Sequence, residues 1–268
     1  MASRERTGLT ARQRRRLSRA VQYGVFAAVV IAVAALADWG RIADSFLRLD
    51  VAADMFPRVW TSFGNTVLYT LLAFVFGMLV GVPIALMRVS SLAAYRWFAT
   101  VYVEVFRGLP ALLVLFLVGF AVPQAFPGVT WPGGVYGQVA IGLGLTSSAY
   151  IAESVRAGIQ AVPPGQVEAA RSLGMSHTRT MITVVLPQAL RIVVPPLTNE
   201  LVLLTKDSSL VFVLGVTTAT MELTKFARSE LTSTANATPL LVGGLLYLLL
   251  TVPLSALARR LENKGDRR

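Results

Sequence analysis

The sequence predicts an all-α integral membrane protein, and its composition and hydropathy pattern carry this prediction. Of its 268 residues, 54% are hydrophobic and 15% are charged, whereas an average soluble protein has about 25% charged residues. The apolar residues form long uncharged blocks, such as residues 59–87 and 108–150, rather than amphipathic patterns. Because roughly 20 apolar residues cross the hydrocarbon layer of a bilayer, we expect these blocks to be transmembrane helices.

Six transmembrane helices are predicted from the blocks. Their expected bounds are residues 21–38, 59–87, 98–121, 137–158, 188–206 and 238–257. The chain then divides into a basic tail (1–20), an extra N-terminal helix with its outer loop (21–58), a five-helix domain (59–257) and a second basic tail (258–268). An alternative for the first block is a cleavable secretory signal, since Ala35-Leu36-Ala37 has the form of a small-residue cleavage site. The length of the block favours an uncleaved helix.

The distribution of charge predicts the orientation. The net charge is +11, with seven arginines before Val21 and five cations after the last block. Six spans with both termini in the cytoplasm also place the basic second and fourth connections inside, as the positive-inside rule requires. We therefore interpret the basic surface as a topology signal and a contact for membrane lipid, and we expect no nucleic-acid binding.

Small and charged residues predict how the helices pack. The Gly77-x-x-x-Gly81 pattern allows close approach of two backbones and predicts a helix-packing face. Glu104 and Arg107, like Glu153 and Arg156, are three residues apart and share a helix face. We expect each to form a structural ion pair near the cytoplasmic end of its helix, with substrate contact as the alternative.

The fifth block is interrupted by polar residues. Its Pro195-Pro196 pair predicts an early break in the helix. Ionisable groups at membrane depth usually face a cavity or a partner charge. We therefore take four residues as candidates for a substrate pathway: Asn199, Glu200, Lys206 and Asp207. A structural polar network between helices is the alternative for the first two.

The connection between the fourth and fifth blocks predicts a compact cytoplasmic knob. Pro163 ends the preceding helix, and Pro164 suits the first turn of a short helix over residues 165–173. Gly174 can adopt the left-handed conformation that closes this helix, and Ser176 can cap the next one. The sequence therefore predicts a helix, a sharp glycine turn and a second helix.

The same connection carries a longer motif. Glu168-Ala169-Ala170 is followed by Gly174, and Leu186-Pro187 comes twelve residues after that glycine. This spacing resembles the docking element by which importer permeases of the ATP-binding-cassette (ABC) type hold their separate ATPase. Four other stretches match the polar-amino-acid branch of these permeases in the same order: Glu104–Pro110, Ala149–Glu153, Pro195–Glu200 and Lys206–Leu210.

The chain is thus similar, over about residues 61–257, to permease subunits of polar amino acid ABC importers. The resemblance implies a five-helix type I importer core, and the added N-terminal helix is similar to that of glutamate-transport permeases. Val184 stands where the pattern usually has Ile, which is a conservative change. Glutamate or another polar amino acid is the implied substrate, and a bacterial inner or plasma membrane is the implied location.

The resemblance also implies the partners and the roles of the loop residues. The expected partners are ABC ATPase subunits, a second permease, which we expect to be a different chain, and an extracytoplasmic solute-binding protein. Glu168 would bond to the ATPase groove, Ala169 and Ala170 would allow close approach, and Gly174 would set the turn. ATP and Mg would be bound by the ATPase, because this chain has no G-x-x-x-x-G-K-[ST] loop.

Other functions fit less well. An ion-gradient-driven secondary transporter accounts for charges within the spans but leaves the knob without a purpose, and the sequence shows no inverted repeat. A membrane-embedded enzyme would need a catalytic set that does not assemble here, so we expect no enzyme activity. We expect no metal site either, because the chain has one histidine, His177, and no cysteine. The sequence alone leaves open which amino acid is carried and whether the two permeases are identical.

Overall fold

The computed structural model describes residues 11–265, which form helices joined by turns and loops and contain no strand. Four of the predicted tail cations, Arg4, Arg6, Arg267 and Arg268, lie outside these residues. The chain forms two units that divide at Arg48 and Leu49, and each is described by itself. The first unit holds α1 (Ala11–Leu36) and α2 (Trp39–Phe46). Here α1 begins in the basic tail, earlier than the predicted 21–38.

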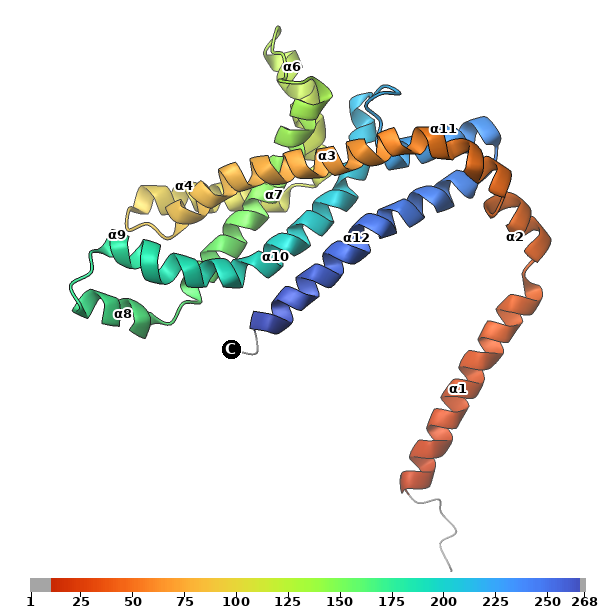
Figure 1. Ribbon diagram of the computed structural model, residues 1–268, viewed down its shortest axis with the longest axis horizontal. Coiled ribbons are helices and arrows are strands. Elements are labelled where there is room, and N and C mark those ends of the chain that lie inside the picture. Colours follow the sequence, from red (N-terminus) through yellow and green to blue (C-terminus); the bar gives the residue numbers. More distant parts are fainter. Residues whose placement is uncertain (1–10, 266–268) are drawn as a thin grey trace, which may run out of the picture. The chain divides into compact units, whose positions relative to one another are not determined.

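The second unit is a bundle built around α7 (Figure 1). Its elements are α3 (Leu49–Arg88), α4 (Ala93–Gly108), α5 (Ala111–Phe116), η1 (Leu117–Ala121), α6 (Val122–Ala125), α7 (Val135–Gln160), α8 (Pro164–Ser172), α9 (His177–Thr180), η2 (Met181–Val185), α10 (Leu186–Asp207), η3 (Ser208–Leu214), α11 (Leu223–Thr234) and α12 (Thr238–Gly265). The central helix α7 contacts α3, α4, α5 and α10, and α10 packs in turn against α12.

Four helical runs of the described chain are long and apolar enough to cross a membrane: Arg12–Leu36, Trp39–Arg88, His177–Leu214 and Thr238–Glu262. A fifth is obtained if Ala93–Gly108 and Ala111–Ala125, which meet at 102°, form one broken span. The predicted span 137–158 is present as α7 but is not among these runs. The count of six spans therefore stays a prediction.

The predicted packing face on α3 is confirmed. A Cβ atom added at Gly81 would lie 2.6 Å from the carbonyl oxygen of Ser148, and one at Gly77 would overlap the Ser147 hydroxyl. Both serines are on α7. The two glycines therefore let α3 and α7 approach more closely than any larger residue would allow.

Two predictions about helix continuity were wrong. The expected span 98–121 is not one helix, because Leu109 is extended (φ −89°, ψ 136°) and Pro110 starts the new helix α5 at a sharp bend. Proline disfavours helical geometry in the residue before it. Conversely, Pro195-Pro196 lies inside the continuous helix α10. Membrane helices tolerate internal proline where neighbouring groups satisfy the freed carbonyl groups.

Candidate functional site

The predicted helix–turn–helix of the knob is confirmed. Helix α8 starts at Pro164 and ends at Ser172. The next turn is left-handed at Gly174 (φ +82°), whose N–H donates to the carbonyl of Arg171 at 3.0 Å. The N–H of Met175 donates to the carbonyl of Ala170 at 3.2 Å, which completes a Schellman arrangement. Ser176 then caps α9 by accepting a hydrogen bond from the N–H of Arg179 at 3.3 Å.

The surface of the knob is partly polar and partly apolar. Glu168 and Ala169 are exposed, as the docking hypothesis requires. Ala170 is only 6% exposed within this chain, and its expected role in close approach to a partner stays a prediction. Leu173, which the sequence reading missed, is 84% exposed at the tip. An apolar residue directly before the glycine turn was the available signal.

The knob is joined to the start of α10. The side-chain amide of Gln188 on α10 donates to the amide oxygen of Gln166 on α8 at 2.7 Å. Val167, next to Gln166 on α8, packs against the hydrophobic cluster that contains Val185 and Ala189. The motif residues Leu186 and Pro187 are exposed in the first turn of α10 rather than in α8. Helix α8 is therefore in direct contact with the start of α10.

Of the two predicted ion pairs, one is formed. Glu153 pairs with Arg156 and also with Arg88, at the end of α3, which the sequence reading did not assign to the pair. Glu104 is exposed and forms no ion pair with Arg107 within the described part of the chain. Arg107 instead places its guanidinium 5.4 Å from the ring centroid of Tyr150. The Glu153 cluster ties α3 to α7 just before the knob.

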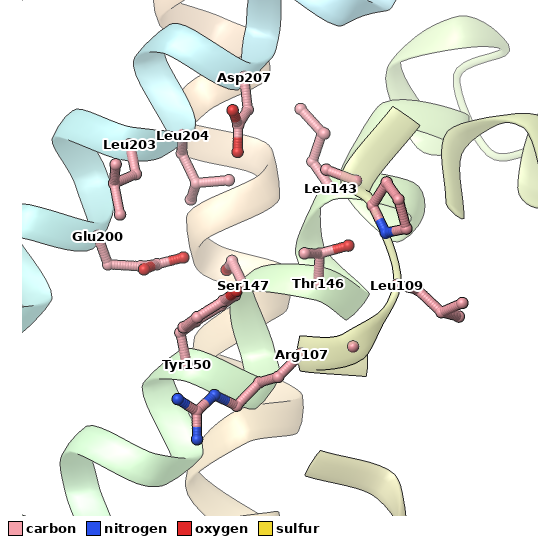
Figure 2. Close-up of a pocket in the computed structure, with 13 residues that line it drawn as sticks. Arg107, Leu109, Leu143, Thr146, Ser147, Tyr150, Glu200, Leu203, Leu204 and Asp207 are labelled. Atoms are coloured by element: carbon pink, nitrogen blue, oxygen red, sulfur yellow. The ribbon is translucent and has the colours of Figure 1, made fainter. Parts of the chain in front are cut away.

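A pocket of about 470 Å³ lies between the α4–α5 break, α7 and α10. Two of the predicted pathway residues line it, Glu200 and Asp207. Figure 2 shows their carboxylates on the α10 side, facing the side of the pocket formed by Thr146 and Ser147 on α7. The other two predicted pathway residues do not line it, since Asn199 donates to Glu262 at 3.2 Å and Lys206 is exposed elsewhere.

The break after α4 supplies the cationic part of the pocket. Residues 107–111 all line it, and Arg107 lies beside Tyr150 at one end (Figure 2). Ser147 is also notable, because its buried hydroxyl has no hydrogen-bond partner, and most buried polar groups are paired. That hydroxyl lies against Gly77 of α3, so the lining offers the Arg107 guanidinium for a carboxylate and two carboxylates for an ammonium group. Substrate contact was the alternative prediction for Arg107, and its position in the lining is consistent with that alternative.

Within residues 11–265, no group of three or more His, Cys, Asp or Glu side chains is placed to hold a metal ion. The comparison with known proteins decides the family. The family described as "Binding-protein-dependent transport system inner membrane component" matches residues 74–266. The chain belongs to this family.

Relatives and solved structures agree with this assignment. "Probable glutamine ABC transporter permease protein GlnM" of Bacillus subtilis is 36% identical over 82% of this chain and 99% of its own length. "Arginine transport system permease protein ArtQ" of the same organism is 31% identical over 81% of this chain and 98% of its own length. A crystal structure of "an amino acid ABC transporter with histidines" matches with a TM-score of 0.70 and 36% identity over 80% of this chain and 96% of that one.

The fold of this binding-protein-dependent permease recurs at low identity. The methionine ABC transporter MetNI, in an inward-facing conformation, matches with a TM-score of 0.65 at 20% identity, over 79% of this chain and 98% of that one. The predicted resemblance and the type I importer permease fold are therefore confirmed. The chain is a multi-pass membrane protein and an amino acid ABC importer permease, and the family favours ATP-driven transport over an ion gradient.

Proposed function

We propose that this chain forms the translocation pathway of an ATP-driven, binding-protein-dependent amino acid importer and couples to its ATPase through the α8–α9 knob. One observation carries the proposal. Gln166 on the knob is bonded to Gln188 on α10, and the same continuous helix carries Glu200 and Asp207 into the pocket. The docking surface and the pathway are thus connected by one rigid element.

The coupling follows from this connection. Movement of the ATPase against Glu168 and Leu173 displaces α8, and the Gln166–Gln188 bond passes the displacement to α10. Because the pocket lies between α10, α7 and the α4–α5 break, a shift of α10 changes its width and its access. Packed helices move as rigid bodies with discrete arrangements, which suits alternation between inward- and outward-facing states. ATP and Mg belong to the ATPase partner.

The pocket favours an amino acid zwitterion. The Arg107 guanidinium can donate to an α-carboxylate, while Glu200 and Asp207 can accept from an α-ammonium group. With two carboxylates to one guanidinium, a second carboxylate on the substrate is repelled. We therefore propose neutral polar and basic amino acids as preferred substrates, ahead of glutamate.

The proposed assembly has two ATPase subunits inside, a second permease of different sequence, and a solute-binding protein outside. It lies in the bacterial cell membrane in contact with lipid, with both termini in the cytoplasm. The basic residues of α1, such as Arg14 and Arg16, support this orientation through the positive-inside rule.

The test is uptake by the co-purified complex in proteoliposomes. Labelled glutamine, arginine, cystine and glutamate are supplied outside with the binding protein, and ATP is enclosed inside. We expect uptake that requires both ATP and the binding protein and that is lost in Glu168→Lys. Uptake driven by an ion gradient, with no ATPase attached and no effect of Glu168→Lys, would establish the secondary transporter instead.

A further inference from the structure

Helix α11 lies at the end of the second unit remote from the knob (Figure 1), and one side of it carries basic residues. It follows α10, which leads away from the knob, so in the proposed orientation it is extracytoplasmic. Four residues on this face line a shallow hollow of about 490 Å³: Lys225, Arg228, Ser229 and Thr232. They lie three, four and seven residues apart, as one side of a helix requires.

The two cations of this face lack carboxylate partners. Of the other outer cations, Arg41 pairs with Asp38 at 3.2 Å, and Arg58 forms a bidentate ion pair with Glu230 at 2.6 and 3.1 Å. Neither Lys225 nor Arg228 forms an ion pair within the part of the chain that the structure describes. Cations are scarce on the outer side of membrane proteins. Two cations without counter-charges in one hollow therefore indicate an anionic partner.

The face is held rigidly by the residues beneath it. Phe226 and Leu223 are buried in a cluster with Met55 and Val59 of α3. Glu222 caps α11 by accepting from the Lys225 N–H at 2.7 Å, and it accepts from the Tyr247 hydroxyl of α12 at 3.1 Å. A surface fixed to both α3 and α12 loses little conformational freedom on binding, which favours docking.

The face is also connected to the pathway. The guanidinium of Arg228 lies 5.9 Å from the ring centroid of Phe212. Phe212 belongs to η3, which begins directly after Asp207 of the pocket. A partner that binds Arg228 thus contacts a side chain that is linked through the short helix η3 to Asp207 of the pocket.

We propose that Lys225 and Arg228, with Ser229 and Thr232, form a docking surface for an acidic face of the extracytoplasmic solute-binding protein. This inference rests on the proposed function, and the family is binding-protein-dependent by its description. All four lining residues carry polar or charged groups, which can form hydrogen bonds and ion pairs with the carboxylates of an acidic protein surface. Charges at such a rim mainly set the association rate and its salt dependence.

The experiment uses the complete transporter in proteoliposomes and varies the concentration of the solute-binding protein that supports wild-type uptake. Arg228→Glu is compared with Arg41→Glu, which makes the same charge change at an outer cation already paired with Asp38. We expect Arg228→Glu to raise the half-saturating concentration of binding protein by about tenfold or more at low salt. Lys225→Glu should add to this effect, and Arg228→Lys should retain most of the wild-type behaviour.

The remaining arms separate the alternatives. Restoration of Arg228→Glu by an acidic-to-lysine change in the binding protein would establish the contact, and it would exclude misfolding of the variant. Equal effects of Arg228→Glu and Arg41→Glu, or no effect of either, would overturn the inference while leaving wild-type uptake intact. A defect that follows the anionic lipid content of the vesicles and persists at saturating binding protein would assign the surface to lipid and also overturn it. Absence of ATP-dependent uptake in the wild type would instead overturn the proposed function.

Discussion

Replacement of Gly174 should uncouple transport through backbone geometry alone. Its φ of +82° lies in the region that L-residues rarely adopt, and a Cβ atom there would meet nothing within 4 Å. The penalty for Gly174→Ala is therefore the left-handed conformation itself, about 1–2 kcal/mol. This penalty lowers the ratio of the native turn to alternative backbone conformations by roughly 5- to 30-fold. Gly174→Asn should be milder, because asparagine tolerates this conformation, and Gly174→Val should be worse.

The chain provides a matched control at Gly165. This glycine lies in the first turn of α8, has no positive φ, and also leaves open space for a Cβ atom. Alanine is favoured over glycine in helices by about 0.5–1 kcal/mol, so Gly165→Ala should be neutral or slightly stabilising. The assay is ATP-driven uptake in proteoliposomes, together with the amount of ATPase that co-purifies with each variant.

The order of the series is the diagnostic result. We expect uptake to fall from wild type through Gly174→Asn and Gly174→Ala to Gly174→Val, with Gly165→Ala at the wild-type level. Uptake that is equal in Gly174→Val and wild type would show that the turn geometry is not needed for coupling. Uptake that falls as much in Gly165→Ala as in Gly174→Ala would show that added volume, and not backbone conformation, is responsible.

Three further predictions address the pocket, the ion pairs and the knob surface. Asp207→Asn should raise the KM for substrate about tenfold or more by removing a charge-assisted contact, whereas Lys206→Gln, outside the pocket, should leave the KM unchanged in the same uptake assay. Glu153→Gln should lower the free energy of unfolding by about 1–3 kcal/mol, because it replaces the carboxylate shared by two arginines with a neutral amide that has one acceptor oxygen. Thermal unfolding in detergent should show no comparable change for Glu104→Gln. Leu173→Asp should weaken ATPase retention on co-purification by roughly 10- to 100-fold, which corresponds to the free energy of burying a leucine side chain on docking. Retention equal to that of Leu173→Met would contradict an apolar contact there.

Local stereochemistry explains which features could be predicted from the sequence. Pro164, Gly174 and Ser176 each act on the backbone within a turn, so the helix–turn–helix of the knob followed from residue types alone. The Gly77–Gly81 packing face could also be predicted, because small residues four apart lie on the same side of a helix and allow another helix to approach closely.

The pocket could not be predicted in the same way, because its lining depends on how separate helices face one another. The break at Leu109-Pro110 was hidden in an uncharged block, and it is this break that brings Arg107 to the pocket. Arg88 reaches Glu153 from a different helix, so sequence spacing could not pair them. The burial of Ala170 and the exposure of Leu173 could not be predicted, because exposure within a short helix depends on the helices packed against it.

The central claim is that the knob docks the ATPase and transmits its motion to the pathway. The absence of cysteine from the chain makes this directly measurable, since Leu173→Cys introduces a unique thiol at the tip. A short thiol-reactive cross-linker should join this residue to an ATPase subunit of the purified complex and block ATP-driven uptake, while the same reagent on Lys225→Cys should give no ATPase adduct. Full uptake by a complex whose Leu173→Cys thiol reacts freely and never cross-links to the ATPase would contradict the account.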